Sequence, residues 1–187
     1  MMASPSEGPS EGPSQDLSQR PPAAGEGSLR ALRWWDVERL TAVEQQVFGP
    51  TAWTPEAFWA ELAHPRSRWY VIAEGLDGGL LGYAGLMVSG SQADVQTVVV
   101  APAGQRRGLG SRLVAALVDE AVRRGASSVM LEARADNEQA IRLYRRHGFE
   151  QISVRRRYYQ PGDVDAVIMR LLPRPAPGRA AVGCSGG

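Results

Sequence analysis

Apolar and polar residues alternate over several short stretches of the chain, and over others the apolar spacing widens to three or four residues. A period of two predicts β-strands, and a period near 3.6 predicts α-helices. Asp36 and the Thr54-Pro55 pair are typical helix starts, and Gly125 and Gly148 are typical helix ends. The expected strands are residues 29–34, 69–74, 80–88, 93–100, 129–133, 149–159 and 165–171, and the expected helices are residues 37–47, 55–63, 112–124 and 137–147. This order predicts the α/β class, with a mixed sheet of about seven strands flanked by about four helices.

The two ends of the chain differ from this patterned region. Residues 1–28 are rich in Ser, Pro, Gly and Glu and hold one large aliphatic side chain, Leu17; residues 173–187 have a similar composition. Such segments bury too little apolar surface to offset the entropy lost on ordering. We therefore expect two disordered tails around one folded domain at residues 29–172.

The charge balance limits the partners. The formal net charge is +1, so no overall field favours nucleic acid or an anionic membrane. Every basic residue is an arginine, which excludes chemistry that needs a lysine amine. We expect no direct nucleic-acid partner and no membrane partner.

The remaining composition is typical of a cytoplasmic protein. Cys184 has no second cysteine to pair with, no apolar run is long enough to span a bilayer, and the N-terminus lacks a signal-peptide pattern. His64 and His147 are too far apart in the sequence to indicate a metal site, so none is expected.

The motif that carries chemistry is the loop QRRGLGS between an expected strand and an expected helix. Its glycines let backbone N–H groups approach a ligand at the positive end of a helix dipole, which suits a pyrophosphate. The loop lacks the further glycine of a dinucleotide-binding turn and the Gly-Lys pair of a Walker A loop, while a purely structural turn stays possible. The candidate ligand-binding residues are Gln105, Arg106, Arg107, Gly108, Leu109, Gly110 and Ser111.

Together, the runs VVVAP, QRRGLG and LEARADNEQAIRLYRRHGF resemble the Gcn5-related N-acetyltransferase (GNAT) superfamily. LEARADN, AIRLYRRHGF and the ending RRRYYQPGDVDAVIMRL are most similar to its RimI-type ribosomal-protein-alanine N-acetyltransferases. The resemblance is strong over residues 95–171 and weaker over 29–90. It implies the GNAT fold, acetyl-CoA as co-substrate, and a loop that holds the coenzyme pyrophosphate.

The same resemblance implies roles for residues outside the loop. Glu132 matches the general base, with an ion-paired strand carboxylate as the structural alternative. Tyr144 matches the acid that protonates the coenzyme thiolate, with a packed helix tyrosine as the alternative. The residues implied to hold the pantetheine arm are Val98, Val99 and Val100, through their backbone, together with Asn137 and Tyr144.

On the acceptor side, the resemblance makes Trp53, Tyr158 and Tyr159 walls of a substrate groove. The adjoining RRRYY run could also be taken for a nucleic-acid patch, but strand alternation would send Arg155 and Arg157 to one face and Arg156 to the other. The implied acceptor is a protein N-terminus, namely the N-terminal alanine of a small-subunit ribosomal protein. A small amine such as a polyamine or aminoglycoside, a protein lysine, and a catalytically silent coenzyme A sensor remain alternatives.

Overall fold

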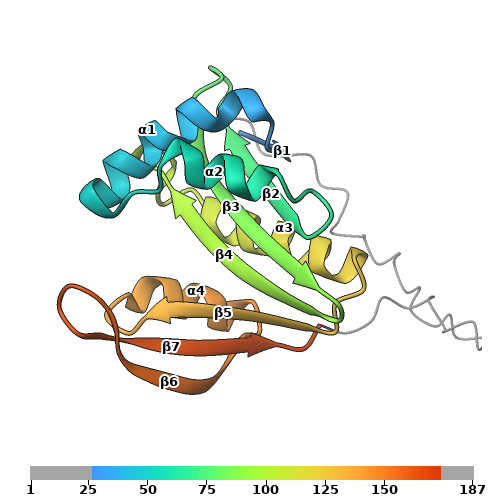
Figure 1. Cartoon of the computed structure of the whole chain (residues 1–187), viewed down its shortest axis with the longest axis vertical. Coiled ribbons are helices and arrows are strands. Elements are labelled where there is room, and N and C mark those ends of the chain that lie inside the picture. Colours follow the sequence, from blue (N-terminus) through green and yellow to red (C-terminus); the bar gives the residue numbers. More distant parts are fainter. Residues whose placement is uncertain (1–26, 174–187) are drawn as a thin grey trace, which may run out of the picture.

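The structure is a computed structural model that describes residues 27–173 of the chain (Figure 1). Apart from Gly27, Ser28 and Pro173, the two expected tails lie outside the described residues, as does Cys184. No helix in the described part is long and apolar enough to cross a membrane. The strands are β1 (Ser28–Ala31), β2 (Arg68–Glu74), β3 (Leu80–Ser89), β4 (Gln92–Val100), β5 (Ser128–Arg134), β6 (Glu150–Tyr159) and β7 (Val164–Leu171), and the helices are α1 (Val37–Phe48), α2 (Pro55–Leu62), α3 (Leu109–Arg123) and α4 (Glu138–Arg146).

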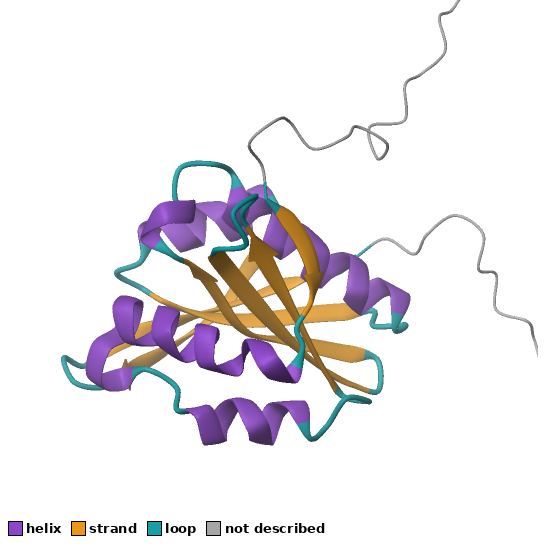
Figure 2. Cartoon of the chain, turned by 90° about the horizontal axis from the view of Figure 1, so that it is seen from above, coloured by secondary structure: helices purple, strands orange, loops and turns teal. Residues whose placement is uncertain are grey.

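The strands form one sheet in the order β1-β2-β3-β4-β5-β7-β6. Neighbouring strands are antiparallel except β4 and β5, which run parallel because α3 carries the chain back between them. Figure 2 shows helices on both faces of the sheet. Within the described residues, the predicted mixed sheet of seven strands with four α-helices is confirmed.

Each face of the sheet has its own apolar core. Leu113 and Leu117 of α3 pack with Leu131 of β5 on the face that α3 and α4 cover. On the opposite face, Leu40 of α1 and Phe58 of α2 pack against the sheet. Burial of one such side chain contributes roughly 1.5–3 kcal/mol, so the apolar stripes of the helices hold them to the sheet.

The first strand is shorter than expected, because a 3-10 turn at Trp34–Asp36 follows it. Asp36 precedes α1, but its side chain does not cap that helix as expected. Instead, its carboxylate accepts the backbone N–H of Arg33 at 2.9 Å, which closes the turn before the helix.

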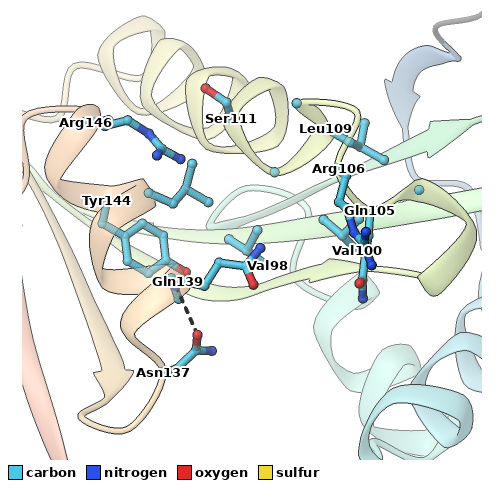
Figure 3. Close-up of a pocket in the computed structure, with 15 residues that line it drawn as sticks. Val98, Val100, Gln105, Arg106, Leu109, Ser111, Asn137, Gln139, Tyr144 and Arg146 are labelled. Carbon is cyan, nitrogen blue, oxygen red and sulfur yellow. Dashed lines mark hydrogen bonds between the residues drawn. The ribbon is translucent and has the colours of Figure 1, made fainter.

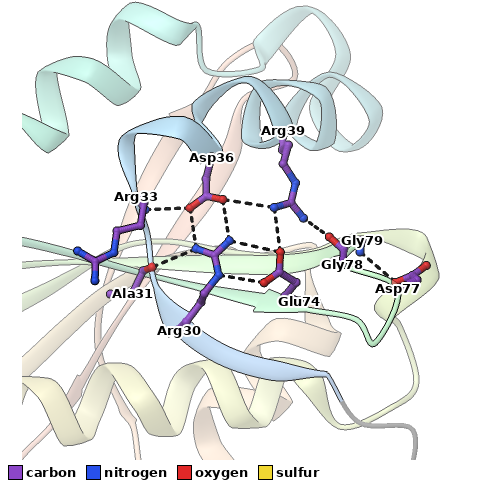
Figure 4. Close-up of polar contacts among 9 residues, drawn as sticks. All are labelled: Arg30, Ala31, Arg33, Asp36, Arg39, Glu74, Asp77, Gly78 and Gly79. Carbon is purple, nitrogen blue, oxygen red and sulfur yellow. Dashed lines mark hydrogen bonds and ion pairs between the residues drawn. The ribbon is translucent and has the colours of Figure 1, made fainter.

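Asp36 also belongs to an ion-pair network that joins β1, α1 and β2 (Figure 4). Arg30 contacts Asp36 at 2.8 Å and Glu74 at 2.9 Å, and Arg39 contacts the same two carboxylates at 3.3 and 2.9 Å. Arg39 also donates to the carbonyl oxygen of Gly78 in the β2–β3 turn. Asp36 is fully buried, and the hydrogen bonds from Arg30 hold its pKa below the usual range.

A bulge in β4 decides which side chains reach each face. Thr97 pairs with Gly85 and Val95 pairs with Leu86, so Gln96 is an extra residue that reverses the alternation beyond it. Val98 and Val100 therefore face α3 and α4, whereas Asp94 faces the opposite side. Beyond Asp94, β4 no longer pairs with β5, and Figure 1 shows the two strands diverging.

A second irregularity lies in β6. Arg155 pairs with Ala166 and Tyr159 pairs with Val164, so β6 carries two residues more than β7 over this stretch. Arg157 has a positive φ of 53°, and its N–H donates to Asp165 Oδ1 at 2.8 Å. The simple alternation expected for the three arginines is therefore wrong.

Candidate active site

A cavity of about 390 Å³ lies between the end of β4, the glycine loop and α4. Figure 3 shows side chains from these three segments converging on it. The sequence-predicted residues that line it are Val98, Val100, Gln105, Arg106, Gly108, Leu109, Gly110, Ser111, Asn137 and Tyr144.

The glycine loop has the backbone shape that its sequence predicts. Gly108 is the N-cap of α3 with a left-handed φ of 72°, and Arg106 also has a positive φ of 60°. A Cβ on Gly108 would meet nothing within 4 Å, so this glycine is required by its conformation. At Gly110 a Cβ would lie 3.2 Å from Leu143 Cδ2, so there the glycine lets α3 approach α4.

This loop fits a diphosphate. The first N–H groups of α3 have no acceptor within the helix, and the helix dipole is positive at that end. Both features lie at the wall of the cavity, because Gly108, Leu109 and Gly110 line it. Arg106 and Arg146 line the same cavity and add positive charge.

Ser111 connects the two helices that border this cavity. Its hydroxyl oxygen lies 2.7 Å from His147 Nε2, at the C-terminal end of α4. Burial, followed by the nearby charge of Arg146, lowers the pKa of His147, which favours the neutral imidazole. The contact therefore fixes the start of α3 against the end of α4.

Tyr144 lies on α4 with its phenol directed into the cavity (Figure 3). Its side chain packs edge-on against Phe149, with ring centroids 5.9 Å apart, and the residue is only 8% exposed. Burial, followed by the charge of Tyr159, raises the pKa of Tyr144 to about 12. The phenol is therefore fully protonated at neutral pH.

Asn137 is the N-cap of α4, as its position in the sequence indicates. Its side-chain oxygen accepts the Ala140 N–H at 3.0 Å. The neighbouring Asp136 does not compete for this position, because it forms an ion pair with Arg134 at 2.8 Å.

A second cavity, of about 530 Å³, lies on the other face of the sheet where β4 and β5 diverge. Three of the predicted site residues line it, namely Glu132, Tyr158 and Tyr159. The other lining residues are Met87, Gln92, Asp94, Val95, Gln96, Met130, Leu131, Arg155 and Ile168. A molecule in this cavity would approach the sheet from the face opposite the glycine loop.

Glu132 is ion-paired within this second cavity. Arg155 Nη1 contacts Glu132 Oε1, and the Arg155 guanidinium lies 5.4 Å from the centroid of the Tyr158 ring. Glu132 thus has an arginine partner, as its structural alternative expects, while the guanidinium of Arg134 lies 5.4 Å from the centroid of the Tyr159 ring. The Glu132 side chain keeps 32% of its surface exposed, so another cation has access to it.

Three predicted site residues line neither cavity. The Trp53 ring packs 5.5 Å from Phe58, and its backbone N–H donates to buried Glu44 at 2.8 Å. The Val99 side chain is buried on the α1–α2 face, so only its backbone is available to a ligand. Arg107 is exposed on the loop and does not line the cavity.

Several lining residues were not predicted from the sequence. Gln139 and Arg146 line the glycine-loop cavity together with Leu143, and the spacing of these three along α4 was a usable signal. In the second cavity, Asp94 and Arg155 come together through strand register, for which the sequence holds no local signal. No group of three or more His, Cys, Asp or Glu side chains in residues 27–173 could hold a metal ion.

Comparison with known proteins agrees with this architecture. The model of the GNAT acetyltransferase family matches residues 29–149. The chain is 41% identical over 148 residues to the N-alpha-acetyltransferase RimI of Mycobacterium tuberculosis, covering 76% of this chain and 90% of that protein. It is 36% identical over 132 residues to the [ribosomal protein bS18]-alanine N-acetyltransferase of Salmonella typhimurium, covering 65% of this chain and 89% of that protein.

A solved structure shares the fold. The crystal structure of the ribosomal-protein-S18-alanine N-acetyltransferase from Escherichia coli superposes with a TM-score of 0.72 at 28% identity, covering 82% of this chain and 99% of that one. The chain therefore belongs to the GNAT family of acetyltransferases, and its reaction transfers the acetyl group of acetyl-CoA.

Proposed function

We propose that the acceptor is the N-terminal α-amine of a protein, and specifically the N-terminal alanine of a small-subunit ribosomal protein. The observation that carries the proposal is the arrangement of two cavities on opposite faces of the sheet, at the point where β4 and β5 separate. Relatives named for alanine N-acetylation of ribosomal protein bS18 support the choice of acceptor.

The glycine-loop cavity is the proposed coenzyme site, and acetyl-CoA supplies an acetyl group activated as a thioester. The N–H groups at the start of α3 bind the diphosphate, and Arg106 and Arg146 add charge. Val98, Val99 and Val100 pair with β3 on one side and are not paired with β5 on the other, so the backbone polar groups that point away from β3 are available to hold the pantetheine arm. Asn137 lies at the same cavity and contributes side-chain hydrogen bonding.

Glu132 is the proposed general base. Its carboxylate accepts a proton from the acceptor ammonium, directly or through a water. An α-amine has an ordinary pKa near ~8, against ~10.4 for a lysine amine, so a carboxylate at the solvent boundary is a sufficient base for it. The incoming ammonium exchanges with Arg155 as the partner of Glu132.

Tyr144 is the proposed general acid. Its hydroxyl gives a proton to the sulfur as the carbon–sulfur bond breaks. Because its pKa is about 12, the phenol holds its proton at neutral pH until the thiolate forms. The proposed base, Glu132, thus lines the cavity on the acceptor face of the sheet, and the proposed acid, Tyr144, lines the cavity on the coenzyme face.

The test is a peptide panel with acetyl-CoA, in which thiol release is followed and the product is identified by mass spectrometry. The peptides differ in their first residue, and control peptides carry a blocked α-amine with one internal lysine. We expect acetylation of the α-amine of peptides that begin with alanine and none of the blocked peptides. Turnover of a polyamine or aminoglycoside in preference to every peptide would overturn the proposed acceptor.

A further inference from the structure

The acceptor-side cavity holds a second carboxylate, Asp94, that neither family resemblance nor the proposed proton transfers explain. Asp94 is half-buried on β4 and lines the cavity with Glu132. Its two oxygens accept hydrogen bonds from the neutral side chain of Gln92 at 3.1 and 3.2 Å. Gln92 leaves the charge of Asp94 uncompensated.

The net negative charge of the cavity therefore comes from Asp94. Among the lining residues, Asp94 and Glu132 are the two acids and Arg155 is the one base, which leaves a net charge of −1. Arg155 is committed to Glu132. When an acceptor ammonium takes the place of Arg155 at Glu132, the cavity is formally neutral, and a cationic side chain of the acceptor competes with the displaced Arg155 for the Asp94 carboxylate.

Register fixes how far apart the two acids lie. Asp94 on β4 is the Cα partner of Met130 on β5, and Glu132 follows Met130 by two residues on the same face. A strand rise of about 3.3 Å per residue and a strand spacing of about 4.8 Å put the two acid Cα atoms about 8 Å apart. An extended peptide advances at most about 3.6 Å per residue, so that span equals two to three residues.

We propose that Asp94 is a specificity-determining residue that selects acceptors with an arginine or lysine at the second or third position. This inference rests on the proposed function, because the acceptor α-amine must lie at Glu132. The cationic side chain pairs with the Asp94 carboxylate while the first residue presents its amine to the base.

The experiment uses the full chain, acetyl-CoA and peptides that all begin with alanine. Positions two and three carry arginine in one peptide, glutamine in the second and glutamate in the third. We expect kcat/KM to be about threefold or more higher for the arginine peptide than for the glutamine peptide at low salt, with the glutamate peptide lowest. Addition of 0.5 M NaCl reduces the ratio, because salt screens a partly exposed pair.

Asp94→Asn is expected to bring the arginine-to-glutamine ratio close to one, whereas Asp94→Glu retains it. Asp119→Asn is the matched control, because Asp119 is exposed on α3 and lines neither of the two cavities. Circular dichroism and thermal melts establish that each variant is folded before kinetics are compared.

Two outcomes would overturn the inference. One is a ratio of one in the unmodified chain, and the other is a ratio that Asp94→Asn leaves unchanged, including the case of an equal loss on all three peptides. An equal loss would mean that Asp94 acts on the chemistry or on Glu132. The absence of α-amine acetylation on every peptide would instead contradict the proposed function itself.

Discussion

The environment of single side chains separates the two proposed proton carriers. Tyr144 is buried against Phe149, and burial raises its pKa, so it is suited to hold a proton. Glu132 lies at a partly exposed strand position, where its carboxylate contacts the Arg155 guanidinium. The proposed acid is therefore buried, whereas the proposed base is ion-paired and open to solvent.

Replacement of Tyr144 by Phe tests the acid. Phe preserves the packing on Phe149 and removes only the hydroxyl, so we expect kcat to fall about 100-fold with little change in coenzyme A affinity. Thiol-release kinetics give kcat, and calorimetric titration gives the dissociation constant. If turnover and affinity fell by the same factor, Tyr144 would be a binding residue instead.

Replacement of Arg155 by Gln tests the competition for Glu132. Removal of the guanidinium frees the carboxylate for the acceptor ammonium, so we expect the peptide KM to fall by up to about fivefold, as for an exposed pair. Arg156→Gln is the matched control, because Arg156 is a neighbouring exposed arginine that does not line the cavity. A higher peptide KM in Arg155→Gln would show that Arg155 binds the acceptor itself.

Among the secondary-structure elements, polar contacts fix how β1 and α1 join the sheet. Asp36 carries no solvent exposure and faces Arg30 and Arg39, while Glu74 on β2 completes the network (Figure 4). Arg30 on β1 and Arg39 on α1 each pair with Asp36, which precedes α1, and with Glu74 on β2. The start of the domain therefore depends on electrostatic pairing as well as on apolar burial.

Replacement of Asp36 by Asn is expected to lower the free energy of unfolding by about 2 kcal/mol. Loss of one partner of a fully buried pair costs about 3–5 kcal/mol, and we take a smaller value because the Arg30 and Arg39 side chains are 32% and 35% exposed. Urea unfolding at pH 7 measures the difference. An unchanged midpoint and slope would mean that the network adds nothing to stability.

The same variant predicts a pH dependence. The folded pKa of Asp36 lies below the unfolded value of about 3.9, so its contribution is present above that pH and is lost as the pH falls through the folded pKa. The stability difference between the unmodified chain and Asp36→Asn should therefore shrink below about pH 4. Urea unfolding repeated from pH 7 to pH 3 gives this curve, and a constant difference would contradict it.

For the molecule as a whole, the separation of β4 and β5 lies between the two cavities that we propose form one reaction site. The parallel pairing covers only three residue pairs, from Gln92↔Ser128 to Asp94↔Met130. Beyond them the strands are held by their other neighbours and by helices on the two faces. Acetyl-CoA bound in the glycine-loop cavity would contact α3, α4 and β4, because residues of all three elements line that cavity.

Because this binding bridges several elements, acetyl-CoA should stabilise the whole domain. At a concentration of 100 times the dissociation constant, the expected gain is about 2.7 kcal/mol, or a rise in Tm of about 5–10 °C. Gly108→Ala should reduce the rise, since alanine is strained at a φ of 72° and distorts the loop. A thermal melt with and without acetyl-CoA measures both, and an equal rise in the variant would exclude the loop as the binding element.

Much of the fold could be predicted because its signals are local. Thr54 caps α2 through the Ala57 N–H, Asn137 caps α4, and Gly108 has the left-handed conformation that its place before α3 indicates. Tyr144 and the glycine loop, apart from Arg107, also line one cavity, as their motifs indicate. Trp53 lines neither cavity, because its packing depends on Glu44 and Phe58 from two other elements.

The sequence by itself determined the element order, the helix ends and the glycine loop, because capping, periodicity and backbone conformation depend on neighbours within a few residues. Only the tertiary structure decided which residues meet across the sheet. The extra residue Gln96 sends Val98 and Asp94 to opposite faces, and the register of β6 with β7 brings Arg155 to Glu132. Strand pairing fixes both features, and pairing depends on the free energy of the whole sheet rather than on any local pattern.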